Sequence, residues 1–143
     1  IAFYHVAKLA QSLGLDTVVT ANGIDELFCG YNGYRDAIKQ GNDFVMELMN
    51  AKLDNEIKMM RQVNHVCSEF GIKIVQPLLS EEFIQYAKTI PIDQKIIDSD
   101  DLQRKHIIRK LAIKIGVPEL SANARKKALQ YGSMIHKTLL KSR

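Results

Sequence analysis

A chain of 143 residues with 46% hydrophobic and 25% charged side chains has the composition of one globular domain. No apolar run approaches the length of a membrane span, and no basic segment followed by an apolar one argues for secretion. The two cysteines and four histidines lack the spacing of a metal or redox motif, so we expect reduced thiols in a cytoplasmic protein.

Charge is distributed unevenly along the chain. Residues 1–102 hold 9 Lys or Arg against 15 Asp or Glu, whereas residues 103–143 hold 11 Lys or Arg and one acid, Glu119. This favours a polyanionic partner, either nucleotide phosphates or nucleic acid, although a solvated basic helix face has the same pattern. Nucleic acid is the weaker alternative, because Tyr131 is the only aromatic residue among these charges.

The first residues predict a helix, a short loop and a strand. Ala2 to Leu13 has apolar residues at spacings of three and four, and Gly14 suits its C-cap. The apolar stripe consists of Phe3, Val6, Ala10 and Leu13. Thr17 to Thr20 follows as a strand rich in β-branched residues. Helix, loop and strand form half of a parallel α/β crossover.

The next residues predict a tight turn that opens a helix. Gly23 allows unusual backbone angles, and Asp25 and Glu26 complement the positive end of the helix that follows. A strand, a tight turn and a helix N-terminus form a common ligand site in α/β proteins. The same pattern also occurs as plain structure, so spacing alone leaves both interpretations open.

The middle of the chain predicts an irregular segment followed by two helices. Gly30 to Gly41 contains three glycines and is typical of irregular structure. Asp43 suits the cap of a first helix. A longer helical pattern covers about Asp54 to Phe70, and Gly71 ends it.

Ile72 to Leu79 is predicted to be extended, although Pro77 excludes it from the middle of a sheet. Ser80 suits the cap of a helix that runs to about Thr89, and Pro91 stops that helix.

The last part of the chain predicts two more helices. An acidic cap cluster at Asp98 to Asp101 precedes a basic amphipathic helix over Leu102 to Ile115, and a final helix covers Ser133 to Lys141. The stripe of the basic helix consists of Ile107, Ile108, Leu111 and Ile115. These elements predict a mostly helical chain with one or two short strands that belong to a parallel α/β domain.

The sequence around the turn resembles that of asparagine synthetases. Val18 to Tyr31, VVTANGIDELFCGY, is similar to the family's hydroxyl-Gly-Glu-Gly-x-Asp-Glu-hydrophobic-Phe-Gly-Gly-Tyr segment. Three further blocks match in the same order, at residues 71–91, 105–109 and 125–133. Four collinear blocks over nearly the whole chain are more specific than any one motif.

The resemblance implies a fold for residues 1–143, the C-terminal part of an adenine-nucleotide α-hydrolase-like domain, or PP-loop ATPase. The family binds pyrophosphate with a Ser-Gly-Gly-x-Asp-Ser loop and carries a glutaminase domain with an N-terminal cysteine, and this sequence contains neither. We therefore expect the chain to be part of a longer protein, and to be inactive and to hold ATP weakly by itself.

The resemblance also implies a ligase. The family adenylates the side chain of aspartate with ATP and Mg²⁺, and ammonia then displaces AMP. The expected partners are ATP, a carboxylate substrate such as aspartate, and a glutaminase domain or subunit that supplies ammonia; a homo-oligomer is left open. One alternative is a related amidoligase with another acceptor, as in β-lactam synthetases. Another is a non-catalytic interaction or regulatory domain that keeps the fold.

The resemblance assigns roles to individual residues. Asp25 matches the acid that helps to hold Mg²⁺, and Lys127 matches the lysine that stabilises charge as pyrophosphate leaves. The implied ATP-binding residues are Thr20, Ala21, Gly23, Lys105 and Arg109. Asn22 replaces a family glutamate implicated in acyl-adenylate formation and in deprotonating ammonia. An amide cannot accept that proton near neutral pH, although it can orient a substrate through hydrogen bonds.

Overall fold

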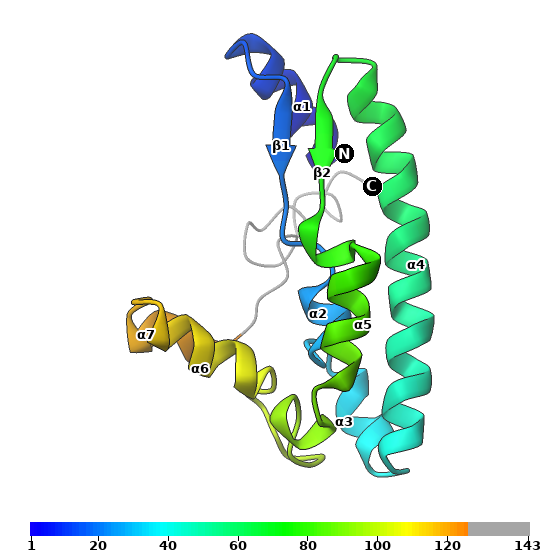
Figure 1. Cartoon of the computed structure of the whole chain (residues 1–143), viewed down its shortest axis with the longest axis vertical. Coiled ribbons are helices and arrows are strands. Elements are labelled where there is room, and N and C mark those ends of the chain that lie inside the picture. Colours follow the sequence, from blue (N-terminus) through cyan, green and yellow to red (C-terminus); the bar gives the residue numbers. More distant parts are fainter. Residues whose placement is uncertain (126–143) are drawn as a thin grey trace, which may run out of the picture.

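The computed structural model describes residues 1–125, which form helices and two short strands (Figure 1). The helices are α1 (Ala2–Ser12), α2 (Ile24–Leu27), α3 (Gly33–Ile38), α4 (Asn42–Ser68), α5 (Glu81–Thr89), α6 (His106–Lys114) and α7 (Glu119–Ala122). The strands are β1 (Thr17–Val19) and β2 (Lys73–Val75), and the 3-10 turns are η1 (Pro77–Leu79) and η2 (Ile92–Gln94). A mostly helical chain with short strands is therefore confirmed. Lys127, Tyr131 and the helix predicted over Ser133 to Lys141 lie outside the described residues.

Strands β1 and β2 pair in parallel, with Val18 opposite Ile74. The pairing extends past β1, because the amide of Thr20 donates to the carbonyl of Val75 at 3.0 Å. Helices α2, α3 and α4 connect the two strands, so the predicted first strand does belong to a parallel pair, and the crossover in the structure follows that strand. The segment predicted to be extended as far as Leu79 stops at Val75, and η1 begins at Pro77, which has no amide hydrogen for a ladder.

Helix α4 is one continuous helix of 27 residues, so the prediction of two helices meeting near Asp54 is wrong. No glycine or proline interrupts it, and it runs the length of the described structure (Figure 1). Its buried positions follow one stripe at helical spacing. They are Val45, Met49, Leu53, Glu56, Met60 and Cys67. The single acid in this otherwise apolar stripe is Glu56.

Two apolar clusters lie along α4. The larger joins α4 to α2, α3 and α5, and its fully buried members include Leu27, Tyr34, Val45, Met49 and Ile96. The smaller joins the end of α4 to α1 and β2 and contains Ala7, Ala10, Met60, Cys67, Ile72 and Ile74. Leu79 of η1 packs against both clusters, so the segment after β2 connects them.

Two predictions about the first third of the chain need correction. The stripe predicted for the first helix is partly wrong, because α1 buries Ala7 and Ala10 while Val6 and Leu13 are exposed. The segment predicted to be irregular contains α3. Its Tyr34 is fully buried and donates a hydrogen bond from its hydroxyl to the carbonyl of Glu26 at 2.6 Å, so tertiary packing supports a helix despite the nearby glycines.

The basic helix begins later than predicted. Helix α6 starts at His106 rather than at Leu102, because Arg104 and Lys105 have left-handed φ angles of 51° and 54°. Of the predicted stripe, the exposed members are Leu111 and Ile115, and the members that pack against the larger cluster are Ile107 and Ile108.

Within residues 1–125, the structure contains no helix with the length and the hydropathy needed to cross a membrane.

Candidate functional site

The turn between β1 and α2 requires glycine at position 23. Gly23 has a φ of +106°, a left-handed value that favours glycine. A Cβ atom there would lie 2.8 Å from the Leu79 side chain and 3.0 Å from the carbonyl oxygen of Leu78. Gly23 therefore lets the turn lie against η1, and the predicted tight turn is confirmed.

A pocket of about 320 Å³ opens beside this turn, beyond the carboxyl end of β1. It is lined by residues 21–26, Tyr31, Glu56 and Lys105. The pocket thus combines the β1–α2 turn and the start of α2 with Tyr31, one residue from α4 and one from the loop before α6. Ligands commonly bind at this end of the strands in α/β proteins.

The amide of Asn22 pairs with a carboxylate from a distant helix. Asn22 Nδ2 donates to Glu56 Oε1 at 2.7 Å. Burial raises the pKa of Glu56, and the nearby Glu26 and Asp25 raise it further, while the bond from Asn22 lowers it. Sequence reasoning missed Glu56. The sequence feature that could have found it is an acidic residue on the apolar stripe of a helix, between Leu53 and Met60.

Asp25 and Lys105 meet across the pocket, although 80 positions separate them in the sequence. The Lys105 Nζ atom lies 2.9 Å from Asp25 Oδ1, and the side chains are 18% and 26% exposed. Gly30 makes room for this carboxylate, because a Cβ atom at Gly30 would lie 2.0 Å from Asp25 Oδ1. The candidate metal ligand and one candidate phosphate-binding cation are thus neighbours.

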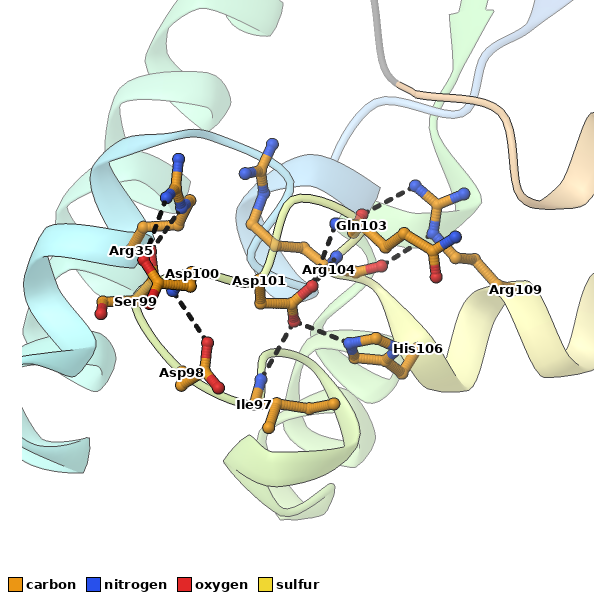
Figure 2. A network of polar contacts seen from close by, with 10 residues as sticks. All are labelled: Arg35, Ile97, Asp98, Ser99, Asp100, Asp101, Gln103, Arg104, His106 and Arg109. Atoms are coloured by element: carbon orange, nitrogen blue, oxygen red, sulfur yellow. Dashed lines mark hydrogen bonds and ion pairs between the residues drawn. The ribbon is translucent and has the colours of Figure 1, made fainter.

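The loop that carries Lys105 is organised by Asp101 (Figure 2). Asp101 Oδ1 accepts hydrogen bonds from the amides of Gln103 and Arg104, at 3.0 and 2.9 Å. Its Oδ2 accepts from the amide of Ile97 at 3.1 Å and lies 2.6 Å from His106 Nε2. Burial acts to raise the pKa of Asp101, but these bonds outweigh it and the pKa is lowered.

The strained backbone at the end of this loop is also fixed from the opposite side. Arg104 is buried, and its Nη2 atom donates to the carbonyl of Gly30 at 3.3 Å. Two consecutive non-glycine residues in left-handed conformation, Arg104 and Lys105, are costly and persist only where surrounding contacts hold them. Here those contacts direct Lys105 toward Asp25.

Arg109 bonds to the protein backbone. Its guanidinium donates to the carbonyls of Arg104 at 2.8 Å and Gln103 at 2.7 Å, and on its other side to those of Ala122 at 2.6 Å and Ala124 at 3.1 Å. It is 7% exposed and does not line the pocket beside the turn. Its implied contact with ATP stays a prediction.

The remaining polar groups near the turn differ in how well they are satisfied. Glu26 is buried and accepts a hydrogen bond from the hydroxyl of Tyr31. Burial, followed by this bond, raises the pKa of Tyr31. By contrast, the Oγ1 atom of Thr20 is buried and has no hydrogen-bond partner among the described residues. A buried hydroxyl without a partner is rare in native proteins and fits a ligand group beside it.

Cys29 lies close to the site but has the properties of a structural residue. It is fully buried, and burial raises the pKa of its thiol to about 12. Its φ of 59° is left-handed, which explains why a glycine suits this position in the similar family segment.

Comparison with known proteins decides the family. A family model described as "Asparagine synthase" matches residues 47–142. The chain belongs to the asparagine synthase family.

Individual members of this family are similar over most of the chain. A protein of Methanocaldococcus jannaschii that bears the name asparagine synthetase, glutamine-hydrolyzing, is 26% identical and covers 99% of this chain. The asparagine synthetase, glutamine-hydrolyzing, of Triphysaria versicolor is 27% identical over 75% of the chain. The chain spans 32% and 18% of the length of these two relatives.

Five of the residues to which the family resemblance assigns a role line this pocket. They are Ala21, Asn22, Gly23 and Asp25 from the family segment and Lys105 from the second half of the chain. Thr20 directly precedes them. Arg109 lies apart from the pocket, and Lys127 is outside the described residues. The roles predicted for these residues remain expectations.

Proposed function

We propose that this chain is the C-terminal part of an ATP-dependent, amide-forming ligase of the asparagine synthetase type. The observation that carries the proposal is the convergence of Asp25, Lys105 and the Asn22–Glu56 pair beside one turn, in a chain of this family. In the proposed reaction a carboxylate of the substrate attacks the α-phosphorus of ATP and pyrophosphate leaves. Ammonia then attacks the acyl carbon, AMP leaves, and the nitrogen loses a proton.

The polar groups beside the turn fit Mg-ATP. Mg²⁺ commonly takes one or two carboxylates besides phosphate oxygens and water, so the carboxylate of Asp25 is a suitable ligand. When bound, Mg²⁺ supplies positive charge that offsets the negative charge of the phosphates. The hydroxyl of Thr20, which has no hydrogen-bond partner among residues 1–125, can donate to the nucleotide, and Lys105 brings a second positive charge beside Asp25.

Glu56 is the group best suited to accept the proton that the attacking nitrogen loses. Asn22 cannot accept it, but its amide orients the Glu56 carboxylate from 2.7 Å. Because burial raises the pKa of Glu56, this carboxylate is a stronger base than an exposed glutamate. The base of the reaction would thus come from α4 instead of from the turn.

A second candidate is an amidoligase that acts on another carboxylate. Asn22, which stands where the family has glutamate, favours it, because the side chain at this position of the turn is neutral. Nitrogen would come from ammonia supplied by a glutaminase domain or subunit, since relatives bear the name glutamine-hydrolyzing. A non-catalytic interaction domain with the same fold is the third candidate.

The test is ATP–pyrophosphate exchange by the complete protein that carries this chain, with aspartate and with a panel of other amino-acid carboxylates. Asp25→Asn should lower exchange by about 100-fold. Glu56→Gln should leave exchange active and lower amide formation by about 100-fold. Asp36→Asn, on an exposed acid of α3, is the matched control. Exchange only with another carboxylate supports the second candidate, and exchange with none supports the non-catalytic reading.

A further inference from the structure

Two buried polar atoms at the ends of the strands have no hydrogen-bond partner among the described residues. They are the Oγ1 atom of Thr20, directly after β1, and the Nε2 atom of Gln76, directly after β2. Within residues 1–125, one further buried side-chain atom is in this condition, Nε of Arg104 in the loop before α6. Because an unpaired buried donor is destabilising, two of them at one place require an explanation.

Thr20 and Gln76 occupy neighbouring positions in the sheet. The last residues of the two strands, Val19 and Val75, are paired in the parallel register. The ladder continues one step further, because the amide of Thr20 donates to the carbonyl of Val75 at 3.0 Å. Gln76 has a φ of −122°, which is typical of a strand. Residues in register on parallel strands have their side chains on the same face, so the hydroxyl and the amide belong together.

These two residues adjoin the candidate pocket. Thr20 precedes Ala21, which lines it. Gln76 leads into η1, which lies against the turn, because a Cβ atom at Gly23 would be 3.0 Å from the carbonyl oxygen of Leu78. Both strands point toward α2, so their carboxyl ends share the edge that carries the pocket (Figure 1). Neither residue lines the pocket itself, so a change of side-chain rotamer, common on binding, accompanies contact with a ligand there.

The chemistry of the two groups selects the part of the ligand that they fit. An amide nitrogen can only donate a hydrogen bond, and a hydroxyl can donate one beside it. Two adjacent donors match one oxygen that accepts several hydrogen bonds. Both are neutral, so they suit a group with a single delocalised negative charge. The α-phosphate of ATP is such a group, and the proposed reaction takes place at its phosphorus.

We infer that Gln76 is a nucleotide-binding residue: its amide and the hydroxyl of Thr20 donate to a non-bridging oxygen of the α-phosphate. This rests on the proposed function. Family resemblance assigns a role to Thr20 but none to Gln76. The contact is retained when pyrophosphate leaves, because the α-phosphate stays in the acyl-adenylate and then in AMP. Gln76 therefore helps to hold the intermediate until the nitrogen attacks.

The test compares AMP with adenosine, which differ only in the phosphate, as ligands of the complete protein that carries this chain. Gln76→Leu removes the donor and keeps a side chain of similar size. We expect it to weaken the binding of AMP by about 10-fold and to leave the binding of adenosine unchanged. Thr20→Val should have the same selective effect. Gln62→Leu, on an exposed glutamine of α4, is the matched control, and titration calorimetry measures each affinity.

Two further measurements separate a lost contact from a lost fold. The phosphorus NMR shift of bound AMP should differ between wild type and Gln76→Leu, and should be unchanged in Gln62→Leu. The melting temperature of unliganded Gln76→Leu should equal or exceed that of wild type, since the change removes a buried donor that has no partner. If Gln76→Leu does not fold, Gln76→Met, with an unbranched apolar side chain, is used under the same criteria.

Two results would overturn the inference while wild-type ATP–pyrophosphate exchange leaves the proposed function standing. Equal losses of affinity for AMP and adenosine in Gln76→Leu would assign the amide to the ribose or the base. Unchanged affinity for AMP in a folded variant would make Gln76 a purely structural residue. A wild type that neither exchanges pyrophosphate nor binds AMP would overturn the proposed function and this inference together.

Discussion

Asn22 and Glu56 form an amide–carboxylate pair in the pocket, with the buried acid as the acceptor and the Asn22 amide as the donor. In the similar family segment a glutamate takes the place of Asn22, so a carboxylate near the turn is retained here but comes from α4. The hydrogen bond runs from the Asn22 amide to the Glu56 carboxylate, because only the amide can donate. Substitutions at the two positions should therefore be strongly coupled.

Asn22→Glu should be destabilising, because it brings two carboxylates within hydrogen-bond distance. We expect a loss of roughly 1–3 kcal/mol in the free energy of unfolding at neutral pH, and lower ligase activity. The double variant Asn22→Glu, Glu56→Gln restores one amide and one carboxylate in reversed order and should recover most of the stability. Denaturant titration of the two variants checks this. Equal stability of both would show that the side chains do not interact.

Lys95 is a second residue whose environment disfavours its charged form. It is fully buried and donates to the carbonyl of Ala87 at 2.7 Å, with its Nζ atom 5.5 Å from the centre of the Phe28 ring. Burial lowers the pKa of Lys95, while Cys29 acts in the opposite direction. The unfolded chain therefore binds a proton more readily than the folded one, and the free energy of unfolding should rise with pH up to the ordinary lysine pKa.

Lys95→Met should stabilise the protein at pH 7 by on the order of 1 kcal/mol, because it removes a buried charge and keeps the volume. The carbonyl of Ala87 keeps a donor in the amide of Ile90, at 3.3 Å. The advantage over wild type should shrink as the pH approaches 10.5, the ordinary value for lysine. Denaturation curves across this range measure it, with exposed Lys58→Met as the control. An advantage independent of pH would argue against a shifted pKa.

At the scale of elements, the loop between η2 and α6 determines where Lys105 lies. Asp101 binds three backbone amides and His106, and these bonds support the left-handed pair Arg104 and Lys105 that delays the start of α6. Arg35 of α3 reaches the same loop by donating to the carbonyl of Ser99 at 2.6 Å (Figure 2). A polar network around Asp101 therefore shapes this part of the site.

Asp101→Asn should loosen this loop, because one of its two acceptor atoms becomes an NH₂ group that faces donors. We expect a loss of roughly 1–3 kcal/mol in the free energy of unfolding at neutral pH. The pKa of Asp101 is lowered in the folded state, so its contribution is present above the ordinary value of 3.8 and is lost as the pH falls below it. The free energies of unfolding of wild type and variant should therefore converge in acid.

The control for this change is Asp98→Asn in the same loop. Asp98 accepts one hydrogen bond, from the amide of Asp100 at 2.8 Å, and the asparagine oxygen can keep it. Thermal unfolding at pH 7 and pH 3 gives the comparison. A constant difference between wild type and Asp101→Asn at both pH values would contradict the proposed linkage.

At the scale of the whole molecule, the candidate site combines three parts of the chain on a framework formed by the parallel strands and α4. The turn after β1 supplies Asn22 and Asp25, α4 supplies Glu56, and the loop before α6 supplies Lys105. The described cation in this pocket, Lys105, is already paired with Asp25. Little positive charge thus remains there to bind three phosphate groups.

The 143-residue chain by itself should therefore bind Mg-ATP weakly, with no saturation in the micromolar range. The Ser-Gly-Gly-x-Asp-Ser loop that binds pyrophosphate in the family does not occur in it. Calorimetric titration of the chain with Mg-ATP measures the affinity, and a protein that also carries such a loop is the positive control. Micromolar binding by the chain alone would mean that the residues described above suffice for the nucleotide site.

The sequence by itself determined the features whose cause is local. Gly14 and Gly23 indicated their turns because only glycine adopts such backbone angles freely, and Ser80 indicated a helix start because its side chain caps an amide three residues on. Resemblance to the family located Asp25 and Lys105 in the same way, through short motifs.

Tertiary structure alone decided the rest, because it depends on contacts between residues far apart in the chain. Tyr34 is buried in a helix where glycines predicted irregular structure, and Leu13 is exposed although its stripe was predicted to be buried. Glu56 could not be paired with Asn22 from spacing, since 34 positions separate them. The family block likewise singled out Arg109, but its hydrogen bonds to the carbonyls of Ala122 and Ala124 depend on how the chain folds back and could not be read from the motif.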